Sequence, residues 1–144
     1  MSNNNKISFK RQSRILAFQA IYINALNPQP IDELILFSWT NSIPAHVYKF
    51  AKELTKKTLE NEEAIVKILN EKMKNPEYDK ISEVEKSILK ISLSQLLFFP
   101  KIAAAIVIDE AIELAKSFGG KNSYKMIHAV LDAINKNLSN YKQD

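Results

Sequence analysis

The chain of 144 residues has no cysteine, only two glycines and five prolines, and a single tryptophan. The absence of cysteine excludes a disulfide framework, a thiol nucleophile and a thiolate metal site. No apolar run approaches the roughly 20 residues that a membrane-spanning helix needs. The polar N-terminus lacks the apolar stretch of a secretory signal. We therefore expect a cytoplasmic protein with no membrane partner.

The excess positive charge of the chain lies entirely in its opening segment. The net charge is +4, and Lys6, Lys10, Arg11 and Arg14 all precede the first acidic residue, Asp32. A basic N-terminal segment beside a neutral body is typical of nucleic-acid binding. A solvated basic helix end is the alternative interpretation, and binding to an anionic membrane surface is a weaker third one.

Hydrophobic periodicity predicts helices along the whole chain. Apolar residues recur at three and four positions, and no segment shows the sustained alternation of a strand. We therefore predict an all-α fold, a compact bundle of about six to seven helices. The predicted helices cover residues 8–26 with Ser8 as N-cap, 32–39, 45–74 with a joint near Asn61, 82–98 opened by a Ser82/Glu85 capping box, 104–118, and a last one that reaches Leu138.

The two glycines, Gly119 and Gly120, stand side by side between two predicted helices. Glycine takes positive φ past a helix end without a steric penalty, so we expect a fixed corner there. The N-terminus of the helix that follows presents free N–H groups and a partial positive charge. Lys121 and Lys125 flank this start, and the corner therefore suits a phosphate or another anion.

One face of the first helix combines cations with an aromatic ring. At about 100° per residue, Lys10, Arg11, Arg14 and Phe18 fall within about a quarter of the circumference. Phosphates of a single-stranded nucleic acid can meet the cations while a base stacks on the ring. In the alternative interpretation, Phe18 belongs to the core and the cations form its solvated rim.

The carboxylates Asp109, Glu110 and Glu113 form a cluster. Asp109 and Glu113 share a helix face, so they could act as acid and base or hold a cation. The two histidines, His46 and His128, stand alone, and a solvated face or one side of a protein interface is the simpler interpretation. No zinc-protease, phosphate-loop or serine-elbow motif occurs. We expect no enzyme, no metal site and no cofactor.

The chain resembles the NusB family of bacterial transcription antitermination factors. The resemblance covers essentially the full length and is weakest between Pro28 and Tyr78. It rests on the segments IVIDEAIELAKSFG (residues 106–119), Ser123-x-Lys125, Val130-Leu131-Asp132 and VEKSILKI (residues 84–91), and on Arg11-x-x-Arg14 followed by Gln19-Ala20-Ile21-Tyr22.

The resemblance implies a single domain of two small helical subdomains, about residues 8–74 and 82–140. It also implies a non-enzymatic role. Family members pair with the ribosomal protein NusE and bind boxA-type single-stranded RNA as it leaves RNA polymerase, in an antitermination complex that acts chiefly in ribosomal RNA operons. By position, the RNA contacts would be Lys10, Arg11, Arg14, Gln19, Phe118, Lys121, Asn122, Ser123 and Lys125, and the NusE contacts would be Tyr22 and Glu85.

The chain departs from the family pattern at several positions. Fewer arginines occur in the first helix, Met126 stands where an aromatic residue is common, and His128-Ala129 replaces Asn-Gly. Ser94-Gln95 replaces Tyr-Glu, which would alter a packing or partner contact.

Two alternatives remain beside an antitermination factor. One is a helical adaptor that binds protein without RNA. The other, weaker, is the detached RNA-binding domain of a ribosomal RNA methyltransferase, which would need a long C-terminal domain beyond Asp144. Monomer and homodimer both stay open. Burial of the basic residues against carboxylates, or separation of the first helix from the glycine corner, would count against RNA binding.

Overall fold

The structure, a computed structural model, describes residues 2–138 and Tyr141, with side chains described from Phe9 onward. Within this part of the chain the only β-pairing is an isolated bridge between Lys74 and Glu77, and no helix there is long and apolar enough to cross a membrane. The all-α prediction is confirmed. The elements are α1 (Ser2–Leu26), α2 (Ile31–Leu34), α3 (Ala45–Glu60), α4 (Glu62–Lys72), the 3₁₀-helix η1 (Tyr78–Lys80), α5 (Glu83–Phe98), α6 (Ala104–Phe118) and α7 (Ser123–Lys136).

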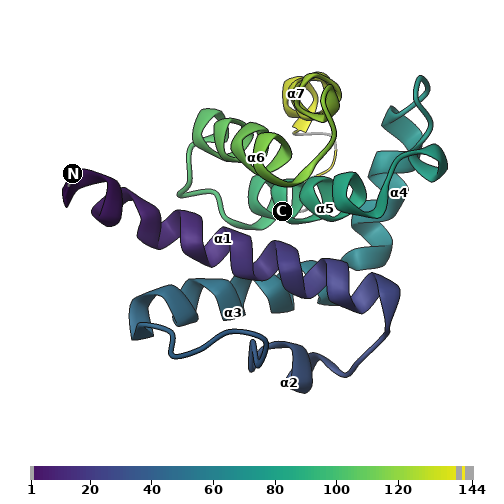
Figure 1. The fold of residues 1–144 in the computed structure, drawn as a ribbon. Coiled ribbons are helices and arrows are strands. Elements are labelled where there is room, and N and C mark those ends of the chain that lie inside the picture. Colours follow the sequence, from purple (N-terminus) through teal and green to yellow (C-terminus); the bar gives the residue numbers. More distant parts are fainter. Residues whose placement is uncertain (1, 139–140, 142–144) are drawn as a thin grey trace.

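Helix α1 crosses the middle of the molecule, between α3 on one side and α5 on the other (Figure 1). Helix α6 packs on α5, and α7 packs on both. Fully buried side chains from three helices, Ile21, Leu54 and Leu89, belong to the same large core cluster. Because this core draws on helices from both halves of the chain, the division into two subdomains stays a prediction.

Two predicted helix boundaries are wrong. Helix α1 begins at Ser2, so Ser8 lies inside the helix rather than at its N-cap; no proline or glycine between them stops the helix. Helix α2 ends at Leu34 instead of Trp39: beyond it the Leu36 and Phe37 N–H groups donate to carbonyls three residues back, and Phe37 then takes a left-handed φ of 49°. The Phe37 ring is 1% exposed, and its burial offsets the backbone strain.

Two predicted boundaries are confirmed. Asn61 separates α3 from α4. The predicted capping box opens α5: the Glu85 N–H donates to Ser82 Oγ at 3.1 Å, and the Ser82 N–H donates to Glu85 Oε1 at 2.9 Å. Local sequence patterns were sufficient for both, because each depends on residues within one turn.

Candidate nucleic-acid interface

The two elements predicted to bind RNA, α1 and the glycine corner, lie side by side. The Phe18 ring of α1 packs against the Phe118 ring at the end of α6, with centroids 5.0 Å apart. Phe18 is 4% exposed, whereas Phe118 is 41% exposed. Phe18 is therefore a core residue, as the alternative interpretation had it, and Phe118 is the aromatic side chain that remains open to a ligand.

Arg11 and Glu110 form a two-pronged ion pair between α1 and α6. Arg11 Nε donates to Glu110 Oε1 at 3.0 Å, and Nη2 donates to Oε2 at 2.8 Å. This hydrogen bonding lowers the pKa of Glu110 and raises that of Arg11. The Arg11 side chain is 42% exposed, while that of Glu110 is 15% exposed. Glu110 thus anchors α6 to α1 instead of lying on a solvated face, whereas Asp109 and Glu113 are exposed.

Arg14 is buried, which argues against the predicted direct RNA contact. It is 4% exposed, and burial lowers its pKa. Its Nε donates to Gln95 Oε1 at 2.8 Å, and its Nη1 lies 3.9 Å from Glu110 Oε1. Position 14 lies at the edge of the helix face that packs on α5, so its guanidinium reaches inward. Gln95, one of the departures from the family pattern, supplies the neutral acceptor.

The aromatic ring of Phe50 lies under two cations in the first half of α1. Lys10 Nζ stands 4.1 Å from the centroid of the Phe50 ring of α3, and the Arg14 guanidinium lies 5.5 Å from the same centroid. Lys10 is exposed. It also lines a hollow of about 410 Å³ with Lys101, which precedes α6, and with Ile106, which lies in the first turn of α6. Phe50 and Lys101 were not predicted from the sequence, since no motif or spacing ties them to α1.

The glycine corner forms for a different reason than predicted. Gly119 has φ −91° and ψ −174°, and neither glycine takes a positive φ. A Cβ on Gly119 would stand 2.8 Å from Ala115 O and 2.8 Å from Ser123 Cβ, whereas one on Gly120 would meet nothing nearer than 3.7 Å. Glycine is needed at position 119 because helices α6 and α7 approach too closely there for a side chain.

Ser123 and Glu85, assigned to RNA and to the protein partner respectively, bind one another. Ser123 is 5% exposed; its Oγ donates to Glu85 Oε2 at 2.6 Å and accepts from Gly120 N at 2.9 Å. Burial raises the pKa of Glu85, but hydrogen bonds from Ser123 and Ser82 outweigh it and leave this pKa below its usual value. The Ser123 hydroxyl therefore fixes the start of α7 against the start of α5, and little of it is open to RNA.

The remaining predicted residues have exposed or partly exposed side chains. Gln19 Oε1 accepts a hydrogen bond from Trp39 Nε1 at 2.9 Å. Tyr124, which was not predicted from the sequence, has Lys116 Nζ at 5.1 Å and Lys125 Nζ at 6.0 Å from its ring centroid. The sequence signal that could have indicated Tyr124 is its position next to Ser123, at the start of α7. The exposed predicted contacts are Lys10, Phe118, Lys121, Asn122 and Lys125.

Acid is expected to destabilise the fold through Glu110 and Glu85. Both pKa values are lowered on folding from an ordinary 4.5, so their stabilisation is complete above pH 4.5 and is lost as pH falls through the lower folded values. Glu85→Gln should shrink the loss of unfolding free energy between neutral and acid pH, measured by urea denaturation. Glu63→Gln, an exposed change on α4, should keep the parent's pH dependence; equal acid loss in both variants would contradict the role of Glu85.

These features describe an all-helical protein whose basic first helix packs beside a tight corner between two later helices. The chain belongs to the NusB family, which matches residues 11–136. It is 41% identical over 128 residues to the transcription antitermination protein NusB of Treponema denticola, covering 87% of this chain and 94% of the relative. The NusB of Treponema pallidum is 32% identical over 131 residues, covering 88% and 92%.

Solved structures share the fold. NusB of T. maritima superimposes with a TM-score of 0.80 at 24% identity, covering 88% of this chain and 90% of that one. A chain from a crystal structure of the antitermination factors NusB and NusE in complex with dsRNA gives a TM-score of 0.81 at 23% identity, covering 90% and 97%. At these identities the likeness establishes the arrangement of the helices.

Proposed function

We propose that the chain is a cytoplasmic transcription antitermination factor that binds boxA-type single-stranded RNA together with the ribosomal protein NusE. Its role is binding rather than catalysis, and it acts within the RNA polymerase antitermination complex in ribosomal RNA operons. The observation that carries the RNA surface is the Phe18–Phe118 contact, which puts α1 and the glycine corner on one surface. Relatives named as antitermination proteins support this role, and a structural neighbour solved with NusE and dsRNA supports joint binding of NusE and RNA.

Geometry divides the predicted RNA contacts into two groups and an intermediate pair. Lys10, Lys121 and Lys125 are exposed and hold phosphates, while Phe118 offers a face to a base and Asn122 offers a hydrogen bond. Arg14 and Ser123 position the surface from within. Arg11 and Gln19 lie between these groups, since each is partly exposed but already paired.

The protein partner is proposed to bind next to the RNA. Tyr22 lies one turn beyond Phe18, with ring centroids 6.4 Å apart, and Glu85 is tied to the corner through Ser123. Both Glu85 oxygens already accept hydrogen bonds within the chain, so the carboxylate would contribute its charge to NusE binding. Adjoining surfaces for the two ligands account for joint binding.

The salt dependence of RNA binding tests this proposal. With NusE present, the slope of log K against log salt for boxA-type RNA should become shallower by about 2 in the variant Lys10→Ala/Lys121→Ala/Lys125→Ala, because each phosphate contact on a single strand contributes roughly 0.7. A matched variant, Lys67→Ala/Lys74→Ala/Lys80→Ala, removes three exposed lysines away from this surface and should retain the parent slope.

Three outcomes would revise the proposal. An unchanged slope in the first variant would remove those lysines from the RNA surface. Equal affinity for a duplex of the same sequence would contradict recognition of a single strand. Binding of NusE without binding of any RNA would favour the helical adaptor.

A further inference from the structure

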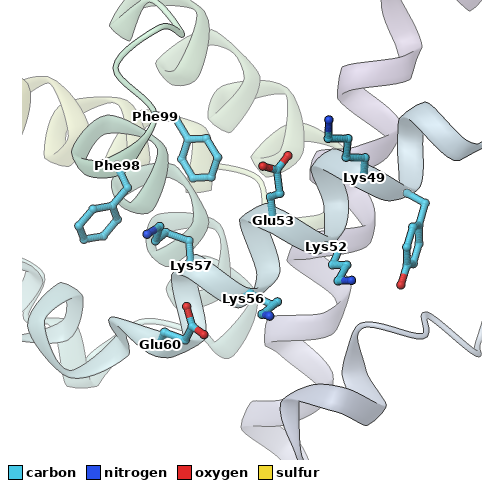
Figure 2. A pocket seen from close by; sticks show the side chains of 9 residues that line it. Lys49, Lys52, Glu53, Lys56, Lys57, Glu60, Phe98 and Phe99 are labelled. Atoms are coloured by element: carbon cyan, nitrogen blue, oxygen red, sulfur yellow. The ribbon is translucent and has the colours of Figure 1, made fainter.

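A lysine-rich groove opens on the outer face of α3, outside the set of predicted RNA contacts. We call it the α3 groove; its volume is about 640 Å³. Figure 2 shows lysine side chains from successive turns of α3 beside two phenylalanines at the end of α5. The lining residues are Tyr48, Lys49, Lys52, Glu53, Lys56, Lys57, Glu60, Phe98 and Phe99.

The α3 groove carries a surplus of positive charge. Its lining holds four lysines against two glutamates. Among the residues that the structure describes, none of these lysines forms an ion pair with a carboxylate. Lys49, Lys52 and Lys56 follow at three and four positions and share one helix face. A row of ammonium groups without carboxylate partners at this spacing complements an extended chain of negative charges.

The α3 groove adjoins the first half of α1 through two aromatic rings. Phe99, in the groove wall, meets Phe50 edge-on with centroids 5.7 Å apart. On Phe50 rests Lys10 Nζ, at 4.1 Å from the ring centroid. The same Lys10 lines the neighbouring hollow with Lys101. Cationic surface therefore continues from α1, past Lys101 and Phe99, to the lysines of α3.

We propose that the α3 groove binds the RNA that flanks the boxA-type element, as a continuation of the strand held by α1 and the glycine corner. This inference rests on the proposed function. RNA fits better than an acidic protein segment for two reasons. Lysine acts as a point charge that suits phosphates irrespective of sequence, and the groove connects with the surface already proposed for RNA. Its aromatic wall adds apolar contact for bases.

Two RNAs and one pair of substitutions distinguish binding at the α3 groove from binding at α1 and the glycine corner. The short RNA holds only the boxA-type element, and the long RNA adds an unstructured flank at its 5′ end or its 3′ end. The full-length protein with NusE should bind one long RNA more tightly and with a steeper salt slope than the short RNA. Lys52→Ala/Lys56→Ala should make the slope for that long RNA shallower by about 1.4, at roughly 0.7 per phosphate, and leave the short RNA unaffected.

Two control variants accompany the measurement. Lys67→Ala/Lys74→Ala removes the same charge from exposed positions outside the α3 groove and should leave both slopes unaltered. Lys52→Arg/Lys56→Arg keeps the charge and should restore the steep slope. Circular dichroism of each variant shows whether the helices are retained.

Each result decides the matter. If the short RNA binds and neither flank adds affinity or slope, the inference is overturned while the proposed function stands. Weaker NusE binding with unchanged RNA binding in Lys52→Ala/Lys56→Ala would overturn it in favour of a protein surface. If neither RNA binds, the proposed function fails and the inference fails with it. A lysine-dependent gain with the long RNA alone would support the α3 groove and contradict the boxA-type site.

Discussion

Glu110→Ala is expected to lower the free energy of unfolding by about 3 kcal/mol, near the lower limit for breaking a buried ion pair by removing one partner. The larger part comes from Arg14, which is 4% exposed and would lose the carboxylate 3.9 Å from its Nη1. Arg11 contributes less, because its side chain is 42% exposed and water can replace the lost partner. Urea denaturation at neutral pH measures the difference.

The matched control is Glu113→Ala, which removes the same charge from an exposed position one turn along α6. It should change the unfolding free energy by less than about 0.5 kcal/mol, as surface substitutions usually do. Glu110→Gln should fall between the two, because its amide oxygen can still accept one bond from Arg11. If Glu110→Ala and Glu113→Ala have the same free energy of unfolding, the Arg11–Glu110 ion pair does not anchor α6 to α1.

Gly119→Ala is expected to destabilise the protein by about 2 kcal/mol, within the range for overpacking a close contact. The added Cβ would lie 2.8 Å from a backbone oxygen of α6 and 2.8 Å from Ser123 Cβ, so the start of α7 must shift. A shift there displaces Lys121 and Lys125 relative to Phe118. We therefore also expect weaker binding of boxA-type RNA under conditions in which the variant and the parent protein are both fully folded. Fluorescence titration with NusE present measures this binding.

Gly120→Ala provides the control next in sequence. Its Cβ would meet Ser123 Oγ at 3.7 Å, an ordinary contact, and its backbone has no positive φ. The substitution should be close to neutral, or stabilising by a few tenths of a kcal/mol through the unfolded chain. Equal destabilisation by both alanines would show that flexibility of the pair, rather than close packing at Gly119, governs the corner.

The sequence was most informative where structure depends on neighbouring residues. The capping box at Ser82 and Glu85 and the break at Asn61 were both predicted, since each involves contacts within a helical turn. The position of the corner was also predicted, but its cause was not. The close approach at Gly119 depends on how α6 and α7 cross, and no local pattern records that.

The candidate site was predicted in outline, but the roles of its charged residues were not. Arg14 lies on the basic face of α1, and periodicity alone does not tell which edge of that face packs on α5. Its partners, Gln95 and Glu110, are 81 residues and 96 residues away in sequence. The one sequence signal was Gln95 itself, a polar residue in a strongly apolar helix. Whether the exposed lysines bind RNA stays a prediction.

The double hydrogen bond between Arg11 and Glu110 has a consequence for ligand selection. Two of the five guanidinium N–H groups of Arg11 donate to the Glu110 carboxylate, so a phosphate that reaches this arginine meets the three remaining donors beside a fixed negative charge. Arg14 stands beside the same carboxylate and offsets part of that charge. We therefore expect an isolated phosphate to bind Arg11 poorly, whereas a strand tethered at neighbouring lysines presents its phosphate at high local concentration. The pairing thus makes occupancy of Arg11 conditional on attachment elsewhere along the same polymer.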